Sequence, residues 1–254
     1  MIAEHMMQLS NHLLAALAAF ALAGAAKAQS LQDFQWLTEE YAPYNYTENG
    51  ELKGIAVDTL VAMWERLGIE RKVSDIRVLP WARGYRMAQE QPGHCLFSTT
   101  VTDSRRELFA FVEPIVDTRV AIVAPRGTLE VDSPAALRDV PVGVVREDIG
   151  ELLMQEAGVD DHLLRTDSAR ALVRMLDAGR FAAISYSLDT VWWNMKAAGI
   201  DTAKYENVHT LTEGVLGFAC PKGTDPALLA RLQGALDALR EDGTLARIRA
   251  NYVD

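Results

Sequence analysis

Residues 71–99 carry the sequence RKVSDIRVLPWARGYRMAQEQPGHCLFST. The run from Arg71 to Leu79 is typical of a strand, Ala82 to Gln91 is typical of a helix ended by Pro92-Gly93, and Cys95 to Thr99 is a second strand. Two parallel strands need a long crossover connection, and a helix usually supplies it. This stretch therefore predicts a βαβ unit and an α/β fold.

The same alternation continues on both sides of this stretch. Upstream, Phe34 to Thr38 predicts a strand, Asn49-Gly50 a hairpin turn, and Asp58 to Leu67 a helix that Gly68 ends. Downstream, the pattern starts again, with strands expected at 120–124, 140–145, 181–185 and 215–220 and helices at 148–158, 168–179, 188–199, 226–240 and 243–252. This order predicts two α/β lobes joined by crossing strands, with a cleft between them.

Composition excludes several functional classes. The 254 residues include 25 Lys and Arg against 35 Asp and Glu, a net charge of −10, which argues against a nucleic-acid partner. Two cysteines cannot build a disulfide scaffold or a four-cysteine zinc site, and the histidines lack metal-ligand spacing. The sequence also contains no phosphate-binding glycine loop and no catalytic dyad. We therefore expect no metal, no cofactor and no catalytic residue.

The first 28 residues have the features of an export signal. Leu13 to Ala26 is uncharged and rich in Ala and Leu, and Ala26-Lys27-Ala28 is a small-x-small cleavage pattern before Gln29. A retained N-terminal helix is the alternative. No later apolar stretch approaches the roughly 20 residues of a membrane span. We expect a cleaved signal peptide at residues 1–28 and a mature protein in the periplasm.

Three stretches, taken in order, resemble the extracytoplasmic solute-binding proteins of family 3. They are Tyr41-Ala-Pro43-Tyr44 followed by Gly54-Ile-Ala-Val-Asp58, then Ser98-Thr-Thr100-Val-Thr102-Asp-Ser-Arg105, and finally Glu241-Asp-Gly243-Thr-Leu-Ala-Arg-Ile. This family includes the polar amino-acid receptors of ABC importers. The resemblance covers essentially all of residues 31–254.

The resemblance implies a periplasmic-binding-protein-like type II fold, with two α/β lobes and a ligand cleft at a two-strand hinge. Lobe 1 would comprise residues 29–118 and 212–254, and lobe 2 residues 119–211. The expected partners are a small-molecule ligand and the membrane subunits of an ABC transporter, and we expect a monomer.

Arg105 is the main candidate for ligand binding. A guanidinium matches a carboxylate with two parallel hydrogen bonds, and the resemblance implies that Arg105 holds the ligand's α-carboxylate. A surface arginine at a helix start is the alternative. Ser98 and Thr100 end a strand on one face, where ligands of α/β sheets bind. Alternatively, they satisfy local backbone groups.

Further candidates are the aromatic walls Tyr44 and Trp81. In the second lobe, Arg146 and Asp148 stand where amino-acid receptors have a Gly-Thr or Ser-Thr turn, and Asp148 alternatively caps a helix in Asp148-x-x-Glu151. Tyr186 lies in the stretch where the acid for the ligand's ammonium is usually found, so the second half of an amino-acid site departs from the family pattern.

The fold that the resemblance implies also pairs Cys95 with Cys220, because the returning strand would lie antiparallel beside the strand that Cys95 begins. An oxidising compartment permits a disulfide between them. Two buried free thiols are the alternative.

The sequence thus predicts a non-enzymatic protein that captures a small anionic or zwitterionic, amino-acid-like solute for ABC-type import. Two alternatives use the same scaffold. One is an enzyme similar to cyclohexadienyl dehydratase, with Glu147 or Asp148 as the general acid, and the other is a stand-alone ligand sensor.

Overall fold

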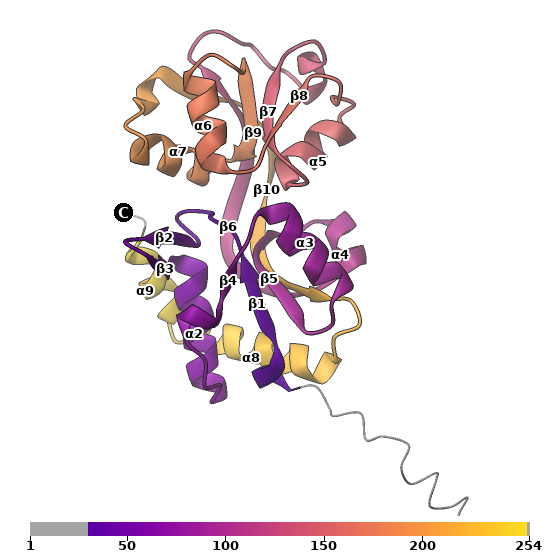
Figure 1. The fold of residues 1–254 in the computed structure, drawn as a ribbon, viewed down its shortest axis with the longest axis vertical. Coiled ribbons are helices and arrows are strands. Elements are labelled where there is room, and N and C mark those ends of the chain that lie inside the picture. Colours follow the sequence, from indigo (N-terminus) through magenta and orange to yellow (C-terminus); the bar gives the residue numbers. More distant parts are fainter. Residues whose placement is uncertain (1–29, 253–254) are drawn as a thin grey trace, which may run out of the picture. The chain divides into compact units, whose positions relative to one another are not determined.

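The strand and helix alternation predicted from the sequence is present in the computed structural model, which describes residues 30–252 (Figure 1). The predicted signal peptide lies outside the described residues. A single eight-stranded sheet has the order β4-β1-β5-β10-β6-β9-β7-β8. We call the half that contains β4, β1 and β5 the first lobe, and the half that contains β9, β7 and β8 the second lobe.

The first lobe is built from elements at both ends of the chain. These are η1 (Leu31–Asp33), β1 (Gln35–Thr38), β2 (Tyr46–Glu48), β3 (Glu51–Lys53), α2 (Ile55–Leu67), η2 (Val73–Asp75), β4 (Arg77–Val78), α3 (Trp81–Glu90), β5 (His94–Thr100), α4 (Asp103–Leu108), α8 (Pro226–Glu241) and α9 (Thr244–Ala250). Strand β1 pairs in parallel with β4 on one side and β5 on the other. The predicted parallel arrangement is confirmed.

Two local predictions in this lobe have different outcomes. The hairpin at Asn49-Gly50 is confirmed, because β2 and β3 pair antiparallel around these two residues, and both have the positive φ that a tight turn needs (52° and 86°). The long strand predicted over residues 71–79 is wrong. It is a 3-10 turn followed by the two-residue β4, whose residues are exposed at the edge of the sheet.

Two strands of 17 residues each join the lobes, β6 (Phe109–Pro125) and β10 (Tyr205–Pro221). They pair antiparallel along their whole length, from Tyr205 opposite Pro125 to Pro221 opposite Phe109. At one end β10 pairs with β5, and at the other β6 pairs with β9. Figure 1 shows both strands passing from one lobe to the other. Apolar patterning predicted only about a third of each strand, because the rest is half exposed.

The second lobe has the elements η3 (Pro134–Leu137), β7 (Val142–Val145), α5 (Ile149–Glu156), β8 (Leu163–Thr166), α6 (Ala169–Asp177), β9 (Ala183–Ser187), α7 (Leu188–Ala197) and η4 (Thr202–Lys204). Strand β7 lies between β8 and β9 and is parallel to both. The predicted helices are present with bounds within about two residues. Strand β8 was missed because its two middle residues are exposed. Among the described residues, no helix is long and apolar enough to cross a membrane.

Buried aromatic side chains form part of the core of the first lobe. In the first lobe, Trp36 contacts Trp64 and Phe218 edge-on, with ring centroids 6.2 and 5.7 Å apart. In the second lobe, one core cluster has aliphatic side chains such as Ile122 and Val144. The aromatic rings of the first lobe bury large rigid surfaces behind β1 and β5.

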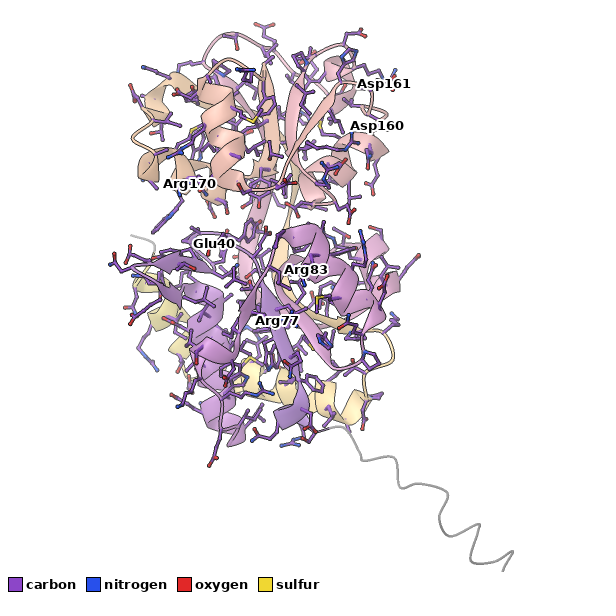
Figure 2. The ribbon with its side chains drawn as sticks, in the orientation of Figure 1. Glu40, Arg77, Arg83, Asp160, Asp161 and Arg170 are labelled. Atoms are coloured by element: carbon purple, nitrogen blue, oxygen red, sulfur yellow. A yellow bond between two sulfur atoms is a disulfide. The ribbon has the colours of Figure 1, made fainter. Side chains whose placement is uncertain are left out.

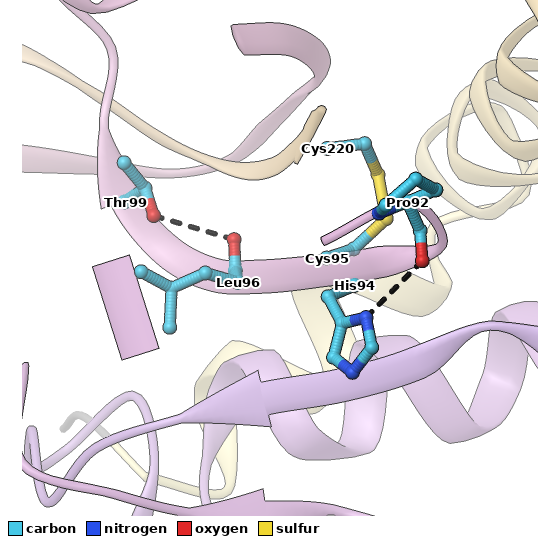
Figure 3. Close-up of a disulfide and its surroundings, with 6 residues drawn as sticks. All are labelled: Pro92, His94, Cys95, Leu96, Thr99 and Cys220. Carbon is cyan, nitrogen blue, oxygen red and sulfur yellow. Dashed lines mark hydrogen bonds between the residues drawn. A yellow bond between two sulfur atoms is a disulfide. The ribbon is translucent and has the colours of Figure 1, made fainter. Parts of the chain in front are cut away.

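Cys95 and Cys220 form a disulfide inside the first lobe (Figure 3). Leu96 of β5 lies opposite Ala219 of β10, so the antiparallel register brings the two cysteines side by side. Their Cα atoms are 4.3 Å apart, and both residues are fully buried. The predicted pairing is therefore present, and it ties β5 to the strand that returns from the second lobe.

Candidate ligand-binding site

Arg105 lies at the start of α4, directly after β5. Thr102 is the N-cap of this helix, and its hydroxyl accepts a hydrogen bond from the Arg105 amide at 3.2 Å. This cap turns the chain so that the arginine side chain points inward. Arg105 is only 1% exposed, so it is a buried arginine and not a surface residue at a helix start.

The first lobe fixes the Arg105 guanidinium on several sides. Nη1 donates to the Thr100 carbonyl oxygen at 3.1 Å. The Trp81 and Tyr85 rings lie 5.1 and 5.4 Å from Cζ, within the range of cation–π attraction. Nε makes no hydrogen bond to any described residue. The guanidinium is thus held in place while part of its donor capacity is unused.

Asp148 approaches Arg105 from the second lobe. Its Oδ1 is 3.6 Å from Arg105 Nη2, and its side chain is 6% exposed. Burial raises the pKa of the Asp148 carboxyl group, although the positive charge of Arg105 opposes this shift. The two residues form a buried ion pair between the lobes.

The helix-capping alternative for Asp148 does not match the structure. Asp148 occupies the N-cap position of α5 but makes no capping hydrogen bond with its side chain. Instead, the Glu151 carboxylate accepts a hydrogen bond from the backbone amide of Glu147, at 2.6 Å. Gly150 brings α5 against β9, because a Cβ at this position would lie 2.2 Å from the Ser185 carbonyl oxygen. This close approach helps to hold Asp148 facing the first lobe.

Glu39 is a site residue that the sequence analysis missed. It follows β1 directly and is 6% exposed. Burial raises the pKa of its carboxyl group well above the usual value, and repulsion from Asp148 adds to the shift. Its position after a parallel strand was the available signal, because ligands of α/β sheets bind beyond the carboxyl ends of the strands.

Ser98 and Thr100 are both buried, but they do not act as alternate residues of a regular strand. Ser98 has a φ of 60°, which interrupts the alternation of side chains along β5. Its hydroxyl donates to Asn45 Oδ1, and Asn45 Nδ2 donates to the Glu39 carbonyl oxygen at 2.6 Å. Ser98 thus supports the loop after β1, whereas Thr100 holds Arg105 through its carbonyl.

Aromatic side chains from both lobes surround the charged residues. The Tyr41 and Tyr186 rings meet edge-on with centroids 5.6 Å apart, and the Tyr44 hydroxyl donates to Asp189 Oδ2 at 2.9 Å. Tyr186 is fully buried, and its hydroxyl has no hydrogen-bond partner among the described residues. An open pocket of about 450 Å³ adjoins Tyr44 and Asp189.

Trp81 connects the lobes as well as contacting Arg105. Its Nε1 donates to the Glu147 carbonyl oxygen at 2.8 Å. Glu147 has a φ of 58°, a conformation uncommon for a residue other than glycine, in the turn that precedes Asp148. The predicted wall residue Trp81 therefore contacts Arg105 in the first lobe and the backbone of Glu147, next to Asp148, in the second lobe.

Arg146, the second-lobe candidate, and Arg83 of α3 are both exposed. Arg146 lies 3.7 Å from the exposed Asp167 in a surface ion pair. Figure 2 labels Arg83 on the first lobe. Of these three arginines, Arg105 alone is buried beside acidic and aromatic side chains. No group of three potential metal ligands occurs among the described residues.

The site therefore combines one buried guanidinium, two buried carboxyl groups and several phenols. A buried polar atom without a hydrogen bond is costly, and Arg105 Nε and the Tyr186 hydroxyl are such atoms. This arrangement is suited to binding a small polar molecule.

The family model "Bacterial extracellular solute-binding proteins, family 3" matches residues 36–254. The chain belongs to this family. The predicted family and the type II fold with two lobes are thereby confirmed, and so is a solute-binding role at the level of the family. A search of curated protein sequences finds no match.

Solved structures of similar fold include sensor and transport proteins. A histidine kinase sensor domain with similarity to periplasmic binding proteins is 22% identical over 87% of this chain and 96% of its own, with a TM-score of 0.77. The arginine-, lysine-, histidine-binding protein ArtJ from Geobacillus stearothermophilus is 18% identical over 87% and 95%, with a TM-score of 0.75. The solute receptor for L-cysteine of Neisseria gonorrhoeae is 18% identical over 87% and 90%, with a TM-score of 0.73. These three structures support the fold.

Proposed function

We propose that this family 3 protein captures a small carboxylate-bearing, amino-acid-like solute in the periplasm and delivers it to the membrane subunits of an ABC importer. The lobes would be residues 29–118 with 212–254, and residues 119–211, and they would close as a monomer around β6 and β10. Binding, rather than catalysis, is the proposed activity.

The observation that carries this proposal is the state of Arg105. A guanidinium that is 1% exposed, packed beside two neighbouring aromatic rings and unbonded at Nε, is prepared for a planar anion. A carboxylate accepts two parallel hydrogen bonds from such a fork. Because hydrogen bonds to charged groups contribute roughly 1.5–3 kcal/mol each, Arg105 can supply a substantial share of a micromolar affinity, which needs about 8 kcal/mol.

Transport is supported by the family and by the fold. One solved relative, 16% identical with a TM-score of 0.71, is the substrate-binding protein of an amino acid ABC transporter. A sensor role would use the same site, and an importer encoded beside this gene would favour transport over sensing. Turnover of a prephenate-like acid would instead support an enzyme.

Thermal unfolding of the exported protein with amino acids, organic acids and polyamines tests the proposal, because a bound ligand raises the apparent stability by mass action. We expect a carboxylate-bearing solute to raise the melting temperature of the wild type. Arg105→Ala should abolish this rise, with a loss of affinity of about 100-fold or more.

Arg83→Ala is the matched control, because it removes an exposed arginine from the same lobe. It should bind the solute as the wild type does. Full binding by a folded Arg105→Ala variant would refute the proposed role of this residue.

A further inference from the structure

Two aromatic side chains from opposite lobes contact each other away from Arg105. Tyr46 begins β2 in the first lobe, and Trp193 belongs to α7 in the second lobe. Their ring centroids are 5.0 Å apart, and the planes of the rings are inclined by 53°. Figure 1 shows β2 and β3 on the side of the first lobe that faces α7. We call Tyr46 and Trp193 the interlobe aromatic pair.

The first lobe holds its member of the pair in place. Tyr46 is buried, Lys53 Nζ lies 5.6 Å from the centroid of its ring, and the Tyr252 ring meets it edge-on at 6.5 Å. The Tyr252 hydroxyl donates to Asp58 Oδ2 at 2.7 Å, which connects this part of the chain to α2. Because Tyr46 is already fixed, little conformational freedom is lost when Trp193 packs on it.

Trp193 differs from the tryptophan next to it. Among the described residues, Trp192 packs against the hydrophobic core, whereas Trp193 is half-buried and does not belong to that packing. Within the same part of the chain, the ring contact that Trp193 makes is with Tyr46 of the other lobe. Burial of its large apolar surface therefore depends on the lobes being together.

A second contact beside the pair joins the same two segments. Asp189 and Trp193 are one helical turn apart in α7, so they lie on one face of this helix. Tyr44, close to Tyr46 in the chain, donates its hydroxyl to Asp189 Oδ2 at 2.9 Å. One face of α7 is thus joined to residues 44–46 at two points, and both contacts are lost when the lobes separate.

The pair is separate from the candidate solute site. Among the described residues, neither Tyr46 nor Trp193 makes a hydrogen bond or a ring contact with Arg105 or Asp148. The free energy of the pair is therefore gained when the lobes close, whichever solute is bound and also when no solute is bound. A contact present in one of two conformations shifts the equilibrium between them.

We propose that Tyr46 and Trp193 hold the lobes together independently of the solute, so that part of the protein is closed before a solute binds. This inference rests on the lobe closure in the proposed function, and it adds a residue pair that sets the closing equilibrium. An aromatic pair of this kind changes the ratio of closed to open protein about 3- to 10-fold. Because the solute is fully held only by closed protein, a common factor enters the affinity for every solute.

Distances between spin labels on the two lobes measure closure without a solute. Arg77→Cys and Asp161→Cys provide one exposed labelling position on each lobe (Figure 2). Cys95 and Cys220 stay unlabelled, because they are buried in a disulfide. The exported protein is unfolded in urea and refolded after dialysis to remove any solute bound during expression. We expect an open and a closed population, the closed one having the distance that saturation with the tightest-binding standard L-amino acid produces.

Trp193→Ala in the labelled protein should lower the ratio of closed to open protein by the factor given above. Trp193→Phe keeps a ring and should lose less. Trp192→Ala is the matched control, because it removes the same indole from the adjacent position. It should reduce the melting temperature, since Trp192 packs against the core, and leave the distances unchanged. Adding Tyr46→Ala to Trp193→Ala should lower the ratio little further, because the two rings form one contact.

Calorimetric titration with the standard L-amino acids gives a second measure. Trp193→Ala should weaken every amino acid that binds the wild type by a common factor, and stopped-flow measurements should show faster dissociation. Losses that differ more than about 3-fold between amino acids would show that the indole contacts the solute, and this would overturn the inference.

Two further results would overturn the inference and leave the proposed function standing. One is solute-free wild type that is entirely open and closes only when an amino acid is added. The other is a closed population that stays the same in Trp193→Ala. Failure of every amino acid and organic acid to bind would instead overturn the proposed function itself.

Discussion

The two lobes hold their halves of the ligand site in different ways. In the first lobe, Arg105 is fixed by the Thr100 carbonyl and by the Trp81 and Tyr85 rings, all from its own lobe. In the second lobe, Asp148 stands at a helix start, makes no capping bond with its side chain, and has Arg105 of the other lobe as its charged partner.

Because of this difference, the two lobes would have different roles in ligand binding. A group held by its own lobe is already in place before the solute arrives, so little freedom is lost when it binds. A group whose partner lies across the lobes changes its environment whenever they separate. The first lobe would therefore provide affinity for a carboxylate. The second lobe would contact the rest of the solute.

The largest expected effect is the loss of unfolding free energy when the disulfide of the first lobe is removed. The double variant Cys95→Ala with Cys220→Ala removes the bond between β5 and β10, which closes a loop of 125 residues. We expect the free energy of unfolding to fall by about 2–5 kcal/mol, as is typical for native disulfides. Urea unfolding of the double variant and of the wild type under reducing and oxidising conditions measures this loss. A wild type that is equally stable under both conditions would contradict it.

Removal of the Trp81 hydrogen bond between the lobes should have a smaller effect, which we expect on solute affinity. Trp81→Phe keeps an aromatic ring beside Arg105 but removes the donor to the Glu147 carbonyl oxygen. One neutral hydrogen bond contributes about 0.5–1.5 kcal/mol, so we expect solute affinity to fall roughly 2- to 10-fold. Tyr85→Phe, which keeps the other ring, is the control. Equal losses in both variants would show that the hydrogen bond to the Glu147 carbonyl does not explain the loss of affinity.

The buried acid of the first lobe should make stability depend on pH. Burial and Asp148 raise the pKa of Glu39 well above its ordinary value of 4.5, so the unfolded chain releases this proton at lower pH than the folded chain. The folded wild type therefore loses stability as the pH rises above about 4.5 and up to the raised pKa. Glu39→Gln should gain stability relative to the wild type over this window.

Urea unfolding at a series of pH values measures the difference between wild type and Glu39→Gln. Glu40→Gln removes the same charge from an exposed neighbour and is the matched control (Figure 2). A difference for Glu39→Gln that stays constant with pH would show that this carboxyl group titrates alike in the folded and unfolded chain.

The smallest effect is expected at Arg146. Its ion pair with Asp167 is exposed, and such pairs contribute at most about 1 kcal/mol. Arg146→Ala should change solute affinity less than about 2-fold in the titrations above. A loss comparable to that of Arg105→Ala would place the carboxylate in the second lobe and reverse the comparison between the lobes.

Sequence patterns were most successful where the structure depends on neighbouring residues. Asn49-Gly50 forms the hairpin, and the apolar spacing of α6 and α8 gave helices close to those observed. They failed where polar residues form regular structure at an edge or between lobes, as in β8 and in most of β6 and β10. There the hydrogen bonds of the sheet, and not burial, decide the conformation.

The amino-acid sequence by itself determined the α/β alternation, the family motifs and the placement of an arginine directly after β5. Only the tertiary structure decided that Arg105 is buried while Arg146 is exposed, and that Glu39 and Asp148 lie near the same guanidinium. Turns and the apolar spacing of helices depend on residues only a few positions apart in the chain. The meeting of residues 39, 105 and 148 depends on the register of two 17-residue strands that carry one lobe back to the other.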